Sequence, residues 1–380
     1  MKFSGSETMN LKVIISGGGT GGHIYPAIAI ANAIKEINNE IEILFVGAEG
    51  RMEMEKVPEA GYKIIGLPIS GIQRRLTLEN LSFPIKLIKS LLKAGSIVSD
   101  FKPNAVVGVG GYASGPIMWR AQSRRVPTII QEQNGYAGLT NKILGGRASK
   151  ICVAYPDMEY YFPKDLIEFT GNPVRQDITD LADKKEEGLK QWGFSNDRKV
   201  AFIFGGSLGA LTLNESMANG VQKLLDQNIQ VIWQTGKYYF EKYNQLFGNR
   251  EKEGLHVVPF VKDMASVYAI SDIVVARAGA LSISELCLAG LPTILVPSPN
   301  VAEDHQTKNA NALVNVDAAV LVKDIEAREI LINEILSLAN DDAKRNELST
   351  QILKLAKPNA AKDIAQNIIS AAEAHYKRMN

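Results

Sequence analysis

The sequence predicts an α/β protein with two domains, each a parallel sheet doubly wound with helices on both faces. Short apolar strands alternate with helical patterns along the chain, which is typical of parallel sheets with right-handed crossovers. A plan of strand, glycine-rich loop and helix begins at Lys12 and again at Val200. The chain has 380 residues, a length that ordinarily divides into two domains. We expect a first domain over residues 1–173 and a second over residues 174–357, with residues 358–380 folding back on the first.

The expected strands form two series. The first series is Lys12–Ile15, Glu42–Val46, Ala105–Val109, Thr128–Gln131 and Lys150–Val153. The second is Val200–Phe204, Gln230–Gln234, His256–Pro259, Ile273–Ala276, Thr293–Val296 and Ala319–Val322. Because ligands of such sheets bind at the carboxyl ends of the strands, we expect the two domains to face each other across a cleft lined by these ends.

Composition and charge limit the possible partners. Hydrophobic residues make up 46% of the chain and the net charge is +1, so a core can form but no global field attracts nucleic acid, and we expect no nucleic-acid partner. Cys152 in an apolar strand and Cys287 in a helix predict buried thiols in a reducing compartment. No signal core and no run of about 18 apolar residues occurs, so we expect a cytoplasmic chain that does not span the membrane.

The most informative stretch is Ser16–Ala27, SGGGTGGHIYPA, where five glycines turn a strand into a helix and His23 stands at the helix start. Glycine lets backbone N–H groups approach a ligand, and the helix N-terminus is partly positive, so the loop suits a phosphate or a sugar. A tight turn alone would account for one or two of the glycines. The stretch also contains the Gly17-x-Gly19-x-x-Gly22 dinucleotide fingerprint, but the acidic residue that should close the second strand is missing.

The segment Ile72–Lys102 is both basic and apolar. Its lysines share one face of a predicted helix, while Ile85, Ile88 and Leu92 share another. Such a helix either lies at an anionic membrane surface or packs on its own sheet through the apolar face. The apolar content of residues 76–83, outside the helix, favours the membrane. The residues expected at the membrane are Arg74, Arg75, Phe83, Lys86, Lys89 and Lys93.

Glycine-rich and polar loops follow two further strands. Gly108–Pro116, GVGGYASGP, contains paired glycines, which suggests that several loops converge on one anionic group. Its end, Ser114–Pro116, is also compatible with an ordinary helix start. Gln131–Asn134, QEQN, stands at the end of an apolar strand, and four polar residues there favour binding of a sugar or a peptide over simple capping.

Taken in order, these motifs resemble one known family. GGGTGGHIYPA, GGYASGP, QEQNGYAGLTN, GNPVR, GGSLGA, RAGALSISEL and EDHQTKNA closely resemble the MurG family of bacterial lipid I N-acetylglucosaminyltransferases, over about residues 11–320. The resemblance implies two Rossmann-like domains in the GT-B arrangement. It also implies transfer of N-acetylglucosamine from UDP to the 4-hydroxyl of the muramyl sugar of undecaprenyl-pyrophosphoryl-muramyl-pentapeptide. That reaction belongs to peptidoglycan synthesis on the cytoplasmic face of the membrane, which the basic apolar segment would touch.

The resemblance further implies which residues hold the two substrates. On the acceptor side these are Gly19, His23, Tyr112, Ser114, Gln133 and Asn134. On the donor side Glu285 binds the ribose hydroxyls, the backbone of Val261 meets the uracil and Gln306 contacts the sugar. The full donor set is Thr20, Gly21, Gly22, Asn134, Arg175, Ser207, Val261, Ala280, Leu281, Ser282, Ile283, Ser284, Glu285 and Gln306.

The donor side also has support, and alternatives, from its own residues. A helix that begins near Ala280–Ser282 suits a diphosphate, and Ser282 and Ser284 either cap it or bind the ligand. Without the resemblance, Glu285 is an ordinary helix-start acid and Gln306 a solvated amide. The family usually has glutamine where Leu208 stands and histidine where Gln131 stands. No role of those two side chains therefore carries over, although donor binding through Ser207 does.

The reaction of the family inverts the anomeric centre, so it needs in-line attack by a hydroxyl and a base. His23 is the candidate base, because the ordinary pKa of histidine, about 6.5, suits that work; alternatively its imidazole only binds the diphosphate. No two aspartates stand two positions apart, so we expect no Asp-x-Asp metal site and no cofactor. Helix N-termini, loop amides and Arg175 would meet the charge of the departing UDP. His256 and His375 are expected to be structural or solvated.

Three other functions remain open from the residues. A UDP-N-acetylglucosamine 2-epimerase would share the fold and the donor but need no lipid acceptor. An oxidoreductase would bind nicotinamide or flavin through the glycine fingerprint. A nucleotide-sensing module would bind the donor without turnover.

Overall fold

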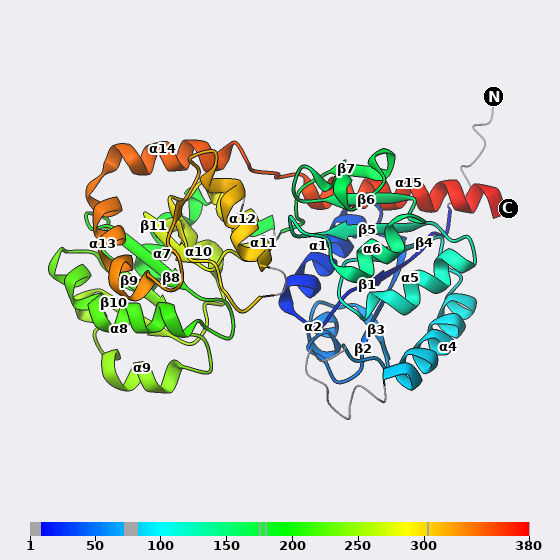
Figure 1. Ribbon diagram of the computed structural model, residues 1–380, viewed down its shortest axis with the longest axis horizontal. Helices are drawn as coiled ribbons and strands as arrows, with labels where there is room; N and C mark the ends of the chain where they lie inside the picture. The colour runs from blue at the N-terminus through cyan, green and yellow to red at the C-terminus, as the bar shows by residue number, and fades with distance from the viewer. Residues whose placement is uncertain (1–8, 72–82, 175, 179–180, 302–303, 380) are drawn as a thin grey trace. The chain divides into compact units, whose positions relative to one another are not determined.

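The computed structural model describes residues 9–71, 83–174, 176–178, 181–301 and 304–379 (Figure 1). The chain divides into two compact units. The N-terminal unit holds residues up to Val174 together with Asn359–Asn380, and the C-terminal unit is Arg175–Pro358.

The N-terminal unit is built on a parallel sheet of seven strands in the order β3-β2-β1-β4-β5-β6-β7. In the register, Val13 lies opposite Ile43 on one side and Ala105 on the other. The strands are β1 Lys12–Ser16, β2 Glu42–Ala48, β3 Lys63–Leu67, β4 Ala105–Gly108, β5 Thr128–Glu132, β6 Lys150–Val153 and β7 Ile167–Phe169. The strands β3 and β7, of five and three residues, form the two edges of this sheet and were not among the expected strands.

Helices cover both faces of this sheet. One face packs against α1 and α15, where Ile364 and Ile368 are fully buried, so the C-terminal helix completes the core of the N-terminal unit. The other face packs against α4, α5 and α6. The helices are α1 Gly21–Ile37, α2 Glu53–Glu59, α4 Phe83–Phe101, α5 Ser114–Ser123, α6 Leu139–Gly145 and α15 Ala360–Met379, with 3-10 turns η1 Met158–Tyr160 and η2 Lys164–Leu166.

The C-terminal unit repeats the plan with six parallel strands in the order β10-β9-β8-β11-β12-β13. The strands are β8 Val200–Phe204, β9 Gln230–Gln234, β10 Leu255–Val258, β11 Ile273–Ala276, β12 Thr293–Leu295 and β13 Val320–Leu321. The helices are α7 Lys185–Trp192, α8 Leu211–Asp226, α9 Phe240–Phe247, α10 Met264–Ile270, α11 Ala280–Ala289, α12 His305–Val314, α13 Ala327–Asn340 and α14 Asp342–Leu353. The 3-10 turns are η3 Gln176–Ile178, η4 Ala182–Lys184 and η5 Glu251–Glu253. Two parallel-sheet units confirm the predicted fold class.

Each sheet has one switch point, where the strand order runs outward in both directions. It lies between β1 and β4 in the N-terminal unit and between β8 and β11 in the C-terminal unit. The loops after these four strands are the positions where sheets of this kind bind ligands. All four carry glycine.

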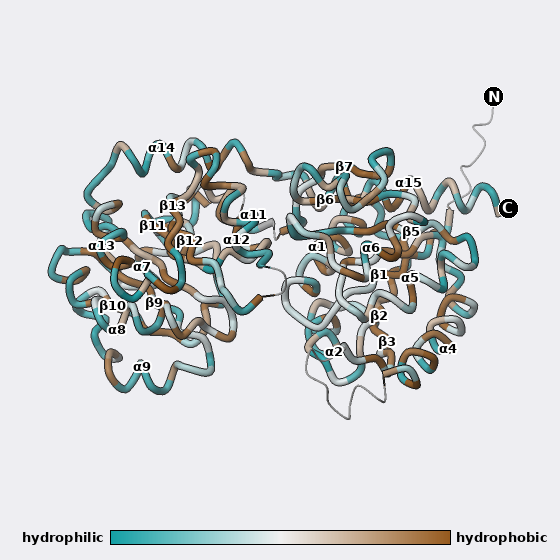
Figure 2. Tube along the Cα trace, viewed as in Figure 1, coloured by the Kyte–Doolittle hydropathy of each residue, from teal (hydrophilic) through white to brown (hydrophobic). Residues whose placement is uncertain are grey.

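The side chains predicted to be structural lie in the core. Cys152 and Cys287 are buried, and burial raises the pKa of each thiol to about 12. The ring of His256 contacts Trp192 and Phe194 edge-on, and partial burial lowers its pKa. Figure 2 shows the apolar residues gathered along the strands of both sheets.

The loop after β8 generates a stability prediction. Gly206 and Gly209 have nearly equal φ angles of +85° and +83°, but a Cβ on Gly206 would meet nothing within 4 Å, whereas one on Gly209 would lie 2.0 Å from the carbonyl oxygen of Thr235. Gly206→Ala should lower the free energy of unfolding by ~1 kcal/mol, the cost of a left-handed backbone. Gly209→Ala should lower it by about 1–3 kcal/mol more, because the loop must also move. Chemical denaturation measures the difference, and equal losses would contradict the close packing.

Candidate functional site

The first glycine loop leads from β1 into α1. Gly19 has a φ of +88°, which glycine adopts without strain, and Thr20 is the N-cap of α1 with an extended backbone. The Thr20 hydroxyl does not cap the helix; its oxygen lies 3.3 Å from Nδ1 of His23. The side chain of Thr20 therefore forms no hydrogen bond to the backbone N–H groups of the first turn, Gly21–His23.

His23 is held in one tautomer by this loop. Its Nδ1 lies 3.1 Å from the carbonyl oxygen of Gly18. A carbonyl only accepts, so Nδ1 carries the hydrogen and Nε2 keeps a lone pair. Burial lowers the pKa of His23, while the Gly18 carbonyl and the charge of Glu53 act in the opposite direction. The imidazole is therefore neutral at pH 7 and available as a base.

The loop after β4 packs against this histidine. Gly110 and Gly111 have φ angles of +97° and +78°. A Cβ on Gly110 would lie 3.0 Å from Nε2 of His23, and one on Gly111 would lie 2.6 Å from the carbonyl oxygen of Gly18. The Tyr112 hydroxyl lies 3.6 Å from where a Cβ on Gly19 would stand. The loops at the switch point thus meet around His23, and glycine at position 110 lets the backbone approach its imidazole.

Sequence reasoning missed Glu53, which lies fully buried at the start of α2. Its Oε2 accepts the N–H of Gly19 at 3.0 Å and its Oε1 accepts the N–H of Ala48 at 2.9 Å. The carboxylate therefore ties the first glycine loop to the end of β2. No local pattern marks Glu53, because it is one of several glutamates in a short charged helix.

The polar run after β5 is more buried than expected. Gln131, Glu132 and Gln133 are all at most 3% exposed. The amide nitrogen of Gln133 donates to the carbonyl of Val109 at 2.7 Å, and that of Gln131 donates to Oδ1 of Asn172 at 3.0 Å. These two side chains thus bind the protein itself, and a role of Gln133 toward the acceptor stays a prediction.

Glu132 organises the chain that follows. Its carboxylate accepts the N–H groups of Asn134 and Gly138 at 3.1 and 2.9 Å and the side-chain amide of Asn141 at 2.8 Å. Burial raises its pKa against these hydrogen bonds. Ser114 is also engaged internally, because its hydroxyl donates to the carbonyl of Gly111 at 2.9 Å. Asn134 is the partly exposed member of the predicted polar run.

In the C-terminal unit, the loop after β8 exposes Ser207 and Leu208. Beneath it lies Gln234, the last residue of β9, which is 3% exposed. Its Nε2 donates to the carbonyl of Gly206 at 3.2 Å and its Oε1 accepts the N–H of Val261 at 2.8 Å. Gln234 therefore joins the predicted diphosphate loop to the predicted uracil contact. The sequence analysis missed it, although a polar residue that ends an apolar strand was a usable signal.

The helix α11 begins at Ala280, as expected. Its N-cap is Gly279, so neither Ser282 nor Ser284 caps it. The hydroxyl of Ser284 instead donates to the carbonyl of Ala280 at 3.0 Å. With glycine as cap, the first backbone N–H groups, of residues 280–282, receive no hydrogen bond from the N-cap side chain, which suits an anionic ligand. One turn further, Glu285 accepts a hydrogen bond from the Tyr268 hydroxyl at 3.1 Å.

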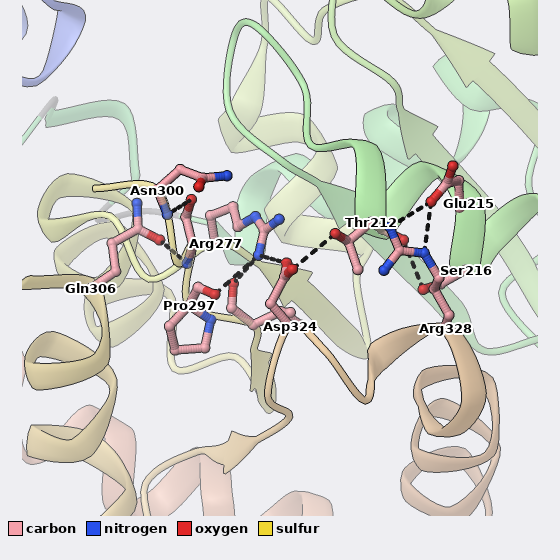
Figure 3. A network of polar contacts seen from close by, with 11 residues as sticks. Thr212, Glu215, Ser216, Arg277, Pro297, Asn300, Gln306, Asp324 and Arg328 are labelled. Atoms are coloured by element: carbon pink, nitrogen blue, oxygen red, sulfur yellow. Dashed lines mark hydrogen bonds and ion pairs between the residues drawn. The ribbon is translucent and has the colours of Figure 1, made fainter. Parts of the chain in front are cut away.

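A partly buried ion pair joins the loops after β11 and β13 (Figure 3). Arg277 pairs with Asp324 at 2.6 Å and donates to the carbonyl of Pro297 at 3.1 Å. Asp324 also accepts the hydroxyl of Thr212 at 3.0 Å. The N–H of Ser298, which follows Pro297, donates to Oε1 of Gln306 at 2.9 Å. The side-chain amide of Gln306, at the start of α12, is therefore held by the backbone.

Three predicted residues, Arg74, Arg75 and Arg175, lie outside the described residues. Within the described ranges, no three His, Cys, Asp or Glu side chains gather as a metal site.

Comparison with known proteins identifies the family. Residues 13–153 match the glycosyltransferase family 28 N-terminal domain, and residues 200–368 match its C-terminal domain. The UDP-N-acetylglucosamine–N-acetylmuramyl-(pentapeptide) pyrophosphoryl-undecaprenol N-acetylglucosamine transferase of Bacteroides thetaiotaomicron is 54% identical over 96% of this chain and 98% of its own. The enzyme of the same name from Porphyromonas gingivalis is 52% identical over 97% of this chain and 98% of its own.

Solved structures agree with these matches. The crystal structure of Acinetobacter baumannii MurG superposes with a TM-score of 0.76 at 27% identity, covering 95% of this chain and 99% of that one. A putative UDP-N-acetylglucosamine 2-epimerase from Listeria monocytogenes shares the fold, with a TM-score of 0.68 at 15% identity, over 98% of each chain. The chain therefore belongs to the MurG family, the bacterial N-acetylglucosamine transferases of glycosyltransferase family 28.

Proposed function

We propose that this protein transfers N-acetylglucosamine from UDP-N-acetylglucosamine to the 4-hydroxyl of the muramyl sugar of undecaprenyl-pyrophosphoryl-N-acetylmuramyl-pentapeptide. The observation that carries the proposal is the identity of 54% over 96% of the chain to a relative named for this donor and acceptor. The 2-epimerase alternative has only the fold in its support, at 15% identity.

The C-terminal unit supplies the groups for the nucleotide. The start of α11 and the loop after β8 present backbone N–H groups and the hydroxyl of Ser207 to the diphosphate. Glu285, steadied by Tyr268, accepts hydrogen bonds from the ribose hydroxyls. The N–H of Val261 is already bonded to Gln234, so Val261 meets the uracil through its carbonyl. These groups stabilise the charge that develops on the departing UDP without a metal ion.

The N-terminal unit supplies the base. His23 presents a neutral imidazole whose Nε2 accepts the proton of the attacking hydroxyl. Because burial lowers the pKa of His23, the basic form persists below pH 6.5, and the acid limb of the pH–rate profile should lie below that value. The loop after β4, with Tyr112, frames the place of the acceptor sugar.

A membrane surface fits the outer face of α4. Ile85, Ile88 and Leu92 are 59%, 59% and 63% exposed, so this apolar face does not pack on its own sheet. The helix packs instead through Ser90, Ala94, Gly95, Ile97 and Val98. None of the described helices has the length and apolar content needed to cross a bilayer. We infer peripheral binding to the cytoplasmic leaflet through this face and its lysines.

The transfer reaction tests the proposal. Incubation with labelled UDP-N-acetylglucosamine should give a labelled lipid product only when a lipid I analogue is present, which separates transfer from epimerisation, redox chemistry and mere binding. His23→Ala should lower the rate by about 10²–10⁴-fold, the usual share of a general base, with UDP affinity by calorimetry nearly unchanged. His375→Ala is the matched control. Wild-type turnover in His23→Ala would remove His23 from the mechanism.

Donor binding should depend on Gln234. Gln234→Met keeps the shape of the side chain but leaves the N–H of Val261 unpaired, at a cost of about 1–3 kcal/mol, and leaves the carbonyl of Gly206 with only the N–H of Gly209. We expect lower thermal stability and weaker UDP binding, because both loops loosen. Calorimetry with UDP checks this, and an unchanged affinity would show that the bridge does not shape the donor site.

Membrane binding should depend on the lysines of α4. Replacing Lys86, Lys89 and Lys93 with glutamate should weaken binding to phosphatidylglycerol vesicles by about 100-fold or more, at ~1 kcal/mol per lysine. Vesicle sedimentation measures the change. Binding should also fall with salt in the wild type.

The apolar face is tested separately. Replacing Ile85, Ile88 and Leu92 with serine should reduce binding to anionic and neutral vesicles alike. Ile325→Ser, at a residue 83% exposed in the other unit, is the matched control. If neither the lysine nor the serine variant loses binding, α4 is not the membrane contact.

A further inference from the structure

The buried carboxylate of Glu53 has partners that point toward the base. A Cβ on Gly18 would lie 2.1 Å from its Oε1, and a Cβ on Gly47 would lie 2.6 Å from its Cγ. Glycine at both positions therefore makes room for this side chain, which is 0% exposed. A carboxylate so enclosed is costly unless it is hydrogen-bonded, and both of its oxygens accept backbone N–H groups.

One peptide unit links Glu53 to His23. The N–H of Gly19, which donates to Oε2 of Glu53, and the carbonyl of Gly18, which lies 3.1 Å from Nδ1 of His23, belong to the same peptide bond. In a planar trans peptide these two groups point in opposite directions. Carboxylate, peptide and imidazole thus form a continuous chain of hydrogen bonds.

We propose that Glu53 is a positioning residue for His23, which it orients and polarises through the Gly18–Gly19 peptide. The carboxylate strengthens the carbonyl as an acceptor, since hydrogen bonds in a chain polarise one another. The carbonyl then holds the hydrogen on Nδ1 and turns Nε2 toward the acceptor hydroxyl. This inference deepens the proposed function and rests on the role of His23 as its base.

The arrangement helps the base when it becomes charged. During transfer, the O–H bond of the acceptor breaks and its proton binds Nε2, while the hydroxyl oxygen bonds to the anomeric carbon. The bond from that carbon to the diphosphate oxygen breaks, and its electron pair leaves with UDP. The imidazolium that results is stabilised by the Gly18 carbonyl and, through the peptide, by the negative charge of Glu53. In other enzymes, an aspartate that is hydrogen-bonded directly to the catalytic histidine stabilises its imidazolium in the same way.

Among the described residues, the other groups near His23 in the N-terminal unit are neutral or face elsewhere. Thr20 contributes a hydroxyl, and Tyr112 from the loop after β4 contributes a phenol on the Gly19 side. The carboxylate of Glu132 is directed to donors at residues 134–141. Glu53 is the charged group that acts on His23, and its charge raises the pKa of the imidazole against the effect of burial.

The test measures the histidine directly. Long-range ¹H–¹⁵N spectra resolve the tautomer and pKa of each of the four histidines, and His23→Ala identifies the signals of His23. We expect hydrogen on Nδ1 in the wild type. Glu53→Gln should lower the pKa of His23 by about half a unit or more. The matched control is Glu42→Gln, which removes an equal charge from an exposed ion pair with Lys12 and should leave that pKa unchanged.

Kinetics give the second readout. Glu53→Gln should lower kcat about tenfold or more with the KM for UDP-N-acetylglucosamine unchanged, and should move the acid limb of the kcat profile to lower pH. A fall in kcat with neither the acid limb nor the pKa of His23 displaced would make Glu53 merely structural and overturn the proposal. Hydrogen on Nε2 in the wild type would overturn it as well.

A measurement on the wild type covers the case in which Glu53→Gln does not fold. The Gly19 amide proton should shift as His23 titrates, because protonation of the imidazole polarises the shared peptide; an unresponsive amide would contradict the link. Full transfer by His23→Ala would instead refute the base role, and the spectra would still decide whether Glu53 acts on the imidazole.

Discussion

Both candidate sites depend on one constraint: at the ends of the strands, the backbone of one loop lies very close to atoms of the next loop. Gly110 brings the loop after β4 against the ring of His23, and Gly209 and Gly236 bring two loops of the C-terminal unit against each other. At each of these positions φ is positive and a Cβ would overlap a neighbouring atom. The glycines therefore do more than permit turns, because they let peptide groups rather than side chains form the binding surface.

The sequence was sufficient for the fold because the signals it rests on are strong and repeated. Apolar strands such as Val200–Phe204 lie between helical patterns, and this alternation indicates parallel sheets with right-handed crossovers. The edge strands β3 and β7 were missed for different reasons: β7 has only three residues, whereas β3 carries the apolar residues Ile64, Ile65 and Leu67, which were a usable signal. The family was identifiable because long motifs, from GGGTGGHIYPA to EDHQTKNA, keep their order along the chain.

The supporting residues of the sites could not be predicted in the same way. Glu53 and Gln234 are distant in sequence from the loops that they hold, by 34 residues for Glu53 and Gly19 and by 28 for Gln234 and Gly206. Only the sheet order brings β2 beside β1 and β9 beside β8. Gln131 and Gln133, part of a run that the sequence presents as polar binding groups, also form internal hydrogen bonds in the fold, and the role of Gln133 toward the acceptor stays a prediction. A polar residue at the end of an apolar strand thus indicates a hydrogen-bond network there. Whether the residue faces a ligand depends on its partners in that network.

The two supporting side chains, Glu53 and Gln234, differ in charge for a physical reason. Both partners of Glu53 are N–H donors, which a carboxylate accepts without needing a hydrogen of its own, whereas Gln234 must accept from Val261 and donate to Gly206. The charge also fits the chemistry expected at each loop. A negative charge behind a base stabilises the imidazolium that forms there, but the same charge beneath a diphosphate loop would repel the donor. Both units therefore use a buried side chain under a glycine loop. The side chain is an amide in the C-terminal unit and a carboxylate in the N-terminal unit, and each suits the electrostatics expected of its half of the reaction.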